Sequence, residues 1–174
     1  FKIDGAQETD RAPAGVGLIV PDLATLSADP QEAKHLVKKI AGACNSIAES
    51  YDVSVRPHPV YEEAFVALHP FINDKLKIVT IQQESARAFI LHHSLLIGTN
   101  STMLLEAVHM RREVVMLDTP VSADQERHRY IHCHPNVTTC SIGALASTVL
   151  EILSRPTPDR FPQTGKTGTE TYES

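Results

Sequence analysis

Two short polar segments, each directly after an apolar run, carry the residue types that bind phosphate. The first segment follows Leu95-Leu96-Ile97 and consists of Gly98, Thr99, Asn100, Ser101 and Thr102. The second follows Val53-Ser54-Val55 and consists of Arg56, Pro57, His58 and Pro59. Hydroxyls, backbone N–H groups at a helix start, an imidazole and a guanidinium all donate hydrogen bonds to phosphate oxygens. The two segments therefore predict a site for a nucleotide or a phosphorylated ligand.

Ser101 and Thr102 stand where a strand passes into a helix-like segment. The unpaired N–H groups and the positive end of the helix dipole favour an anion there. The alternative is plain N-capping, since Ser and Thr are preferred caps at any helix start. Hydroxyls and an amide at four consecutive positions exceed what one cap needs, which favours a ligand.

Glu106 lies four residues after Thr102 and is predicted to share its helix face. A carboxylate at this place could accept hydrogen bonds from the two hydroxyls of a ribose. The alternative is a solvated acid in the first turns of a helix.

His58 lies between two prolines that fix the backbone on both sides. A rigid imidazole at the end of a strand can bind phosphate oxygens as a cation or protonate a departing phosphate. Arg56 adds positive charge nearby. The alternative is a turn histidine beside prolines that only end the strand.

The sequence HRYIHCH places His128, His132, Cys133 and His134 close together. Zinc accepts His and Cys ligands, but no second half with ligand spacing follows. We therefore expect no metal, and interpret this segment as a His-rich loop near the substrate.

Other polar residues have simpler interpretations. His92, His93 and His109 are predicted to lie on helix surfaces, and Asp118 to end a strand at the ligand edge, with capping of the next turn as its alternative role.

The elements that must position these residues alternate between strands and helices. Such alternation predicts right-handed βαβ units and a parallel sheet. We expect an α/β fold, a Rossmann-like parallel sheet with helices on both faces. Strands are expected at 16–20, 53–56, 77–80, 95–98, 114–117 and 137–140, and helices at 30–50, 61–68, 84–93, 102–110, 123–131 and 143–154.

Composition limits the class of protein. The chain has 174 residues, a net charge of −5 and only 5% aromatic residues, so nucleic acid is not expected as a partner. No apolar stretch approaches the roughly 20 residues that cross a bilayer. Three cysteines without CxxC spacing favour a reducing, cytoplasmic compartment. The motifs GxGxxG, GxxxxGK[ST] and GxSxG are absent, which argues against Rossmann dehydrogenases, P-loop NTPases and α/β-hydrolases.

The expected organisation is an arm or linker at 1–15, one nucleotide-sugar-binding domain at 16–155 and a flexible tail at 156–174. Because the chain begins with Phe1 rather than Met, we expect a longer protein with a further N-terminal domain.

The segments RPHP and GTNSTMLLEA resemble the C-terminal, donor-binding half of a GT-B glycosyltransferase. They are most similar to bacterial capsule-polysaccharide and sialyltransferase-type enzymes that use CMP-activated sugars. Those enzymes carry a His-Pro pair and, well downstream, a Ser-Ser or Ser-Thr pair, which correspond here to His58-Pro59 and Ser101-Thr102. The resemblance implies that His58 contacts the donor phosphate and assists departure of CMP, that Ser101 and Thr102 hold that phosphate, and that Glu106 lies towards the nucleoside.

The same resemblance implies an inverting transfer in surface polysaccharide synthesis, with a nucleotide sugar as co-substrate and no further cofactor. The partner would be an N-terminal acceptor domain, with room for peripheral membrane association through the full-length protein. Two departures stand out. Arg111-Arg112-Glu113 replaces the usual Gly-Lys-Pro, and Ile3-Asp4-Gly5 matches only in part the acidic motif that supplies the catalytic base.

Two other functions remain open. UDP-N-acetylglucosamine 2-epimerases and the glycerophosphate transferases of teichoic-acid synthesis share related patterns, so a sugar-nucleotide epimerase-like domain is one alternative. A non-catalytic α/β interaction module is the other.

Overall fold

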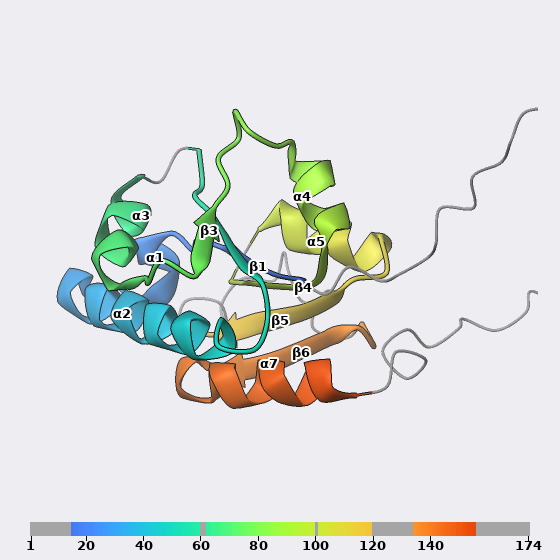
Figure 1. The fold of residues 1–174 in the computed structure, drawn as a ribbon. Coiled ribbons are helices and arrows are strands. Elements are labelled where there is room, and N and C mark those ends of the chain that lie inside the picture. Colours follow the sequence, from blue (N-terminus) through green and yellow to red (C-terminus); the bar gives the residue numbers. More distant parts are fainter. Residues whose placement is uncertain (1–14, 60–61, 100, 120–133, 156–174) are drawn as a thin grey trace, which may run out of the picture.

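The computed structural model describes residues 15–59, 62–99, 101–119 and 134–155. These residues form a six-stranded sheet with helices on both faces (Figure 1). The predicted Rossmann-like α/β fold is therefore confirmed. Residues 1–14 of the predicted arm, the tail and the helix at 123–131 lie outside the described residues, whereas Gly15, the last residue of the predicted arm, begins the first strand.

All strands of the sheet run parallel, in the order β3-β2-β1-β4-β5-β6. All six predicted strands are present, and their bounds differ from the predicted ones by no more than two residues. The strands are β1 (Gly15–Ile19), β2 (Val53–Arg56), β3 (Leu76–Ile78), β4 (His93–Gly98), β5 (Glu113–Asp118) and β6 (Val137–Ser141).

The helices divide between the two faces of the sheet (Figure 1). One face is covered by α1 (Leu23–Leu26), α2 (Pro30–Ile47), α3 (Glu62–Leu68), the 3-10 turns η1 (His69–Phe71) and η3 (Ile142–Ala144), and α7 (Leu145–Ser154). The other face is covered by α4 (Ala86–His92) and α5 (Thr102–His109). Both faces of the strands are thus buried, which explains why their sequences are apolar without alternation.

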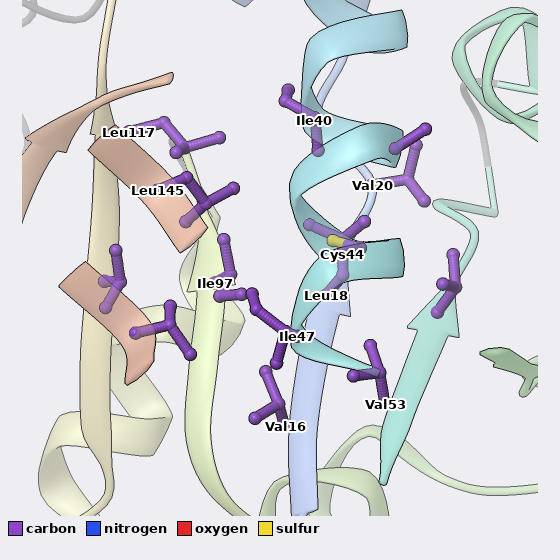
Figure 2. Packing of buried hydrophobic residues seen from close by; sticks show 14 of the residues in the cluster. Val16, Leu18, Val20, Ile40, Cys44, Ile47, Val53, Ile97, Leu117 and Leu145 are labelled. Carbon is purple, nitrogen blue, oxygen red and sulfur yellow. The ribbon is translucent and has the colours of Figure 1, made fainter. Parts of the chain in front are cut away.

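The larger core lies between α2 and the sheet. Figure 2 shows Ile40, Cys44 and Ile47 of α2 packed towards Val16 and Leu18 of β1. This is the apolar stripe that helical spacing predicts along α2, with Cys44 as an additional member. Complete burial raises the pKa of the Cys44 thiol to about 12, which makes this thiol inert.

The smaller core packs α4 and α5 against the opposite face of β1 and β4. Gly17 makes this packing possible, because a Cβ atom there would lie 2.5 Å from Cδ2 of Leu96 and 2.8 Å from Cε1 of Phe89. The Phe89 ring therefore lies directly on the β1 backbone and is fully buried.

The start of α2 follows the predicted pattern of an Asp cap and a Pro at the first helical position. The Asp29 carboxylate accepts a hydrogen bond from the Gln31 N–H at 2.9 Å. Glu32 accepts from the Ser27 hydroxyl at 2.6 Å, and that hydroxyl accepts from the Asp29 N–H at 3.1 Å. Ser27 thus stands between the two partners that a capping box joins directly.

One prediction of local structure was wrong, and one short helix was not predicted. His93 is not on a helix surface; it is the first residue of β4 and only 5% exposed. Its ring packs on Phe89, with 4.3 Å between centroids, and its Nδ1 donates to the Phe89 carbonyl at 2.6 Å. The short helix α1 was not predicted at all, although Asp22 caps it by accepting from the Ala24 N–H.

Candidate functional site

β1 and β4 are neighbours in the sheet, but after them the chain continues to helices on opposite faces. The chain leaves β1 towards α2 on one face, whereas it leaves β4 towards α5 on the other face. In open α/β sheets, ligands bind at the carboxyl ends of the strands at such a switch point. The candidate site therefore lies where β1 and β4 end, beside the first residues of α5.

Ser101 and Thr102 begin α5 at this switch point. Ser101 is the N-cap, and its hydroxyl accepts from the Met103 N–H at 3.2 Å. Ser101 is partly exposed and Thr102 is exposed, so both reach solvent at the positive end of the helix. The capping alternative is real for Ser101, yet its exposure leaves it accessible to an anion as well. Asn100 lies outside the described residues.

Gly98 fixes how closely α5 approaches β4. A Cβ atom there would lie 3.2 Å from Leu104 Cδ1 and 3.6 Å from Ile19 Cβ. Gly98 is itself buried, so its contribution is to set the position of the helix start that follows it.

Thr99 is 3% exposed and bonds within the protein. Its Oγ1 lies 3.1 Å from the Thr25 Oγ1. Thr25 already donates its only hydroxyl hydrogen to the Asp22 carbonyl at 2.7 Å, so Thr99 is the donor of the pair. Thr119 donates to the Thr25 carbonyl at 2.7 Å. Three threonines thus hold α1 at the ends of β4 and β5. Thr99 contributes to the site as a buried residue that fixes these segments, since it does not reach solvent.

Glu106 is exposed on α5. It lies one turn after Thr102 on the same side of the helix, as the spacing predicts. The carboxylate is therefore accessible to a ligand that extends along α5 from its N-terminus.

Arg56 ends β2 two strands away from β4, a separation of about 10 Å. Its guanidinium lies 5.2 Å from the centre of the Phe89 ring, and its Nη2 donates to the Glu84 carbonyl at 3.0 Å. Only 4% of the residue is exposed, and its Nη1 has no hydrogen-bond partner in the described part of the chain. Burial lowers the pKa of Arg56, while the Glu84 carboxylate acts to raise it. Arg56 is thus enclosed by protein and supports this edge from below.

His58 and Pro59 follow β2 at the same edge of the sheet. Pro57 and His58 are half-buried and Pro59 is exposed. His58 also makes an interaction within the protein. The two predicted segments therefore lie along one edge of the sheet, separated by the end of β1.

The remaining predicted residues are distributed differently. His92 is exposed and pairs with Glu84, and His109 is exposed on α5, as predicted. Asp118 is exposed at the end of β5, on the predicted edge. His128, His132 and Cys133 lie outside the described residues, while the His134 Nδ1 accepts from the Asn136 N–H at 3.2 Å.

Sequence patterns missed the supporting residues. Thr25, Thr119 and Glu84 hold the segments around the site, yet none lies in a recognisable motif. The pair Pro21-Asp22 after β1 was the available signal for α1, because a strand end followed by an Asp cap marks a helix start.

Within the described residues, no helix combines the length and apolar character needed to cross a bilayer. The same residues contain no group of three or more His, Cys, Asp or Glu side chains arranged to hold a metal ion.

Comparisons with known proteins show the fold. No family model matches the sequence, and no curated protein matches it. A solved structure of a putative UDP-N-acetylglucosamine 2-epimerase from Listeria monocytogenes is similar, with a TM-score of 0.59 and 14% sequence identity. The match covers 88% of this chain and 40% of the Listeria chain. This chain therefore spans well under half the length of that protein.

A second similar structure is the molybdenum cofactor carrier protein of Chlamydomonas reinhardtii. Its TM-score is 0.52 and its sequence identity 14%, and the match covers 81% of this chain and 98% of the carrier. At such identity a likeness shows the fold alone. The chain has a Rossmann-like, GT-B-like α/β fold.

Proposed function

We propose that this domain binds a nucleotide-activated sugar at the carboxyl ends of β1 and β4. The observation that carries the proposal is topological: the exposed start of α5, with Ser101 and Thr102, lies at the switch point of the sheet. Ligand phosphates bind at such places because helix N–H groups and the dipole act together.

Each exposed group has a role in this proposal. The phosphate lies against the N-terminus of α5 and bonds to the Ser101 and Thr102 hydroxyls. The ribose hydroxyls donate to the Glu106 carboxylate one turn further along. His58, held by the two prolines beyond β2, donates a proton or a charged hydrogen bond to the departing phosphate. Gly98, Thr99 and Arg56 position these groups from within the protein.

We further propose that the complete protein transfers the sugar of a CMP-linked donor with inversion, with this domain as its donor-binding half. The base that activates the acceptor would then belong to a partner domain. Protein hydrogen-bond donors would hold the phosphate and stabilise its charge as the sugar leaves.

A second candidate is a sugar-nucleotide epimerase, favoured by the likeness to the Listeria structure. An epimerase of this kind would use a UDP-linked sugar, so the preference between CMP and UDP separates the two functions. A third candidate, a non-catalytic module, is favoured by the match along almost the whole Chlamydomonas carrier. That candidate predicts no binding of either nucleotide.

The first experiment measures binding of CMP and UDP to this chain by isothermal titration calorimetry and thermal shift. We expect CMP to bind and to raise the melting temperature more than UDP does. A stronger effect of UDP would favour the epimerase, and no heat or shift with either nucleotide would overturn the proposed site.

Ser101→Asp tests the phosphate contact without removing the helix cap. Asp caps as well as Ser and suits the positive end of α5, so the folded state stays at least as stable. The new carboxylate repels phosphate, and affinity should fall at least tenfold, about 1.4 kcal/mol. Equal affinity in Ser101→Asp and wild type would show that the phosphate binds elsewhere.

Glu106→Gln and His58→Ala test the other two contacts. Glu106→Gln keeps the side-chain shape and should weaken nucleotide binding severalfold, whereas free inorganic phosphate should bind as before. His58→Ala should weaken CMP binding strongly. Glu151→Gln, an exposed change on α7, serves as the matched control and should change neither the affinity for CMP nor the affinity for inorganic phosphate.

A further inference from the structure

An open groove runs between α2 and the segment formed by α3 and η1. Its floor and rims carry apolar side chains from Leu23, Val66, Ala67, Pro70 and Phe71. Val66 is 68% exposed and Phe71 41% exposed. Two of the four large hydrophobic residues exposed in the described part of the chain therefore lie in this one groove. Isolated exposed apolar residues are ordinary, but a grouped set marks an interaction surface.

The two walls of the groove carry opposite charge. Lys34 and Lys38 project from α2, and Glu62 and Glu63 begin α3 on the opposite wall. Within the described residues, none of these four side chains forms an ion pair. The Lys38 Nζ instead lies 5.2 Å from the centre of the Phe71 ring. Among the described residues, two cations and two anions without an ion-pair partner thus flank an apolar centre.

We propose that a second copy of this chain docks on this groove, forming a two-fold dimer. A two-fold axis that lies along the groove places α2 of one chain against α3 of the other. The positive wall of each chain then faces the negative wall of its partner, and Val66 and Phe71 of both chains meet in between. An axis across the groove would instead place lysines against lysines. The charge arrangement therefore selects both the partner and the symmetry.

The size of the surface sets the strength of the dimer. The groove is lined by residues 31–38 of α2 and by residues 62–71 of α3 and η1, so the surface is about 15 Å long, and two adjacent helices make it about 20 Å wide. Each chain then covers about 300 Å², the size of a weak and transient contact. The dimer should form in the micromolar range and depend on salt, because exposed ion pairs contribute to it.

The dimer would not depend on the nucleotide site. α2 and α3 cover one face of the sheet, whereas α5 covers the other (Figure 1). Ser101, Thr102 and Glu106 stay accessible in such a dimer, so nucleotide binding and association can be measured separately.

Two charge variants provide the sharpest test. The first carries Glu62→Lys and Glu63→Lys, so both walls are positive; the second carries Lys34→Glu and Lys38→Glu, so both walls are negative. In sedimentation equilibrium from about 1 to about 300 μM, a range that spans micromolar affinity, we expect wild type to shift from monomer to dimer. Each variant alone should stay monomeric, and an equimolar mixture should form the heterodimer. A wild type that stays monomeric throughout, or a mixture that does, would overturn the proposal.

Val66→Asp tests the apolar centre, with Ile81→Asp as the control. Ile81 is 46% exposed but lies in the turn between β3 and α4, outside the groove. Val66→Asp should weaken the dimer at least tenfold, and Ile81→Asp should leave it as in wild type. If Val66→Asp associates like wild type, or if Ile81→Asp abolishes association, the dimer uses another surface and the proposal fails.

Discussion

The ends of β2 and β4 occupy comparable places in the sheet, but their polar residues are buried to different extents. At the end of β2, Arg56 is 4% exposed and enclosed by the Phe89 ring and the Glu84 backbone. At the end of β4, Ser101 is partly exposed and Thr102 is exposed. Polar residues at the carboxyl edge can therefore either face solvent or be enclosed by protein, according to the helix that packs over them.

The packing of Phe89 explains this difference. Gly17 has no side chain, so the ring from α4 lies on the β1 backbone and extends beneath Arg56. α5 packs on β4 in the same close manner through Gly98, yet its N-terminus projects to solvent. One helix covers a strand end, and the other leaves a strand end open to solvent.

The largest expected effect comes from removing the Phe89 ring. Phe89→Ala should lower the free energy of unfolding by about 3–5 kcal/mol, because the ring is fully buried and contacts Arg56 and His93. Urea unfolding measures the change. Leu91→Ala, on the exposed side of the same helix, is the control and should change stability by less than about 1 kcal/mol. A small effect of Phe89→Ala would show that the end of β2 is not supported in this way.

The next effect separates the packing of Arg56 from its charge. Arg56→Met keeps an apolar stem on Phe89 and removes a buried cation whose Nη1 lacks a partner in the described part of the chain. Arg56→Ala also loses the packing. We expect the alanine variant to be less stable than the methionine variant by about 1–2 kcal/mol. In titrations with CMP, Arg56→Met should bind within a factor of two of wild type. A loss comparable to that of Ser101→Asp would place Arg56 in contact with the ligand.

Sequence patterns were sufficient for the framework and for the positions of the candidate residues at the strand ends. Strong local signals such as Asp29-Pro30 and the serine before α5 mark helix starts, and apolar runs mark strands. Because parallel strands end at one edge, the sequence also predicts that His58 and Ser101 share that edge.

Burial at the strand ends could not be predicted, since it depends on contacts between distant segments. Arg56 is covered by a ring 33 residues away (89 − 56), and Thr99 bonds to a hydroxyl 74 residues away. The sequence predicts His93 on a helix surface, but the residue begins β4 and is buried against the Phe89 ring, a contact that sequence spacing does not show. The short helix α1 is held by the same kind of long-range contact, through Thr119.

A smaller effect is expected at the other end of α5. Arg111 has a φ of 56°, the conformation that glycine adopts after a helix, and the GT-B resemblance expects glycine here. Arg111→Gly should raise the free energy of unfolding by about 1 kcal/mol, because the side chain no longer strains the backbone. Arg87→Gly, within the exposed part of α4, should lower it by a similar amount. Arg111→Gly should leave CMP affinity unchanged, which would confine the ligand contact to the start of α5.

His93 should make stability depend on pH, because its ring packs on the same Phe89 ring that supports Arg56. Burial is the main cause that lowers the pKa of His93, although its bond to the Phe89 carbonyl acts in the opposite direction. The unfolded chain therefore takes up a proton at His93 at a higher pH than the folded chain does. The neutral His93 ring therefore contributes to the free energy of unfolding. This contribution is fully present above the unfolded pKa of about 6.5 and is lost as the pH falls from there towards the folded pKa. Urea unfolding should show that the free energy of unfolding of wild type falls between pH 8 and pH 5.5, and that the fall is smaller in His93→Gln. His109→Gln, on the exposed side of α5, is the control and should behave as wild type. An equal loss in all three would mean that the acid sensitivity arises away from the Phe89 support, and the covered end of β2 would then be no more sensitive to pH than the open end of β4.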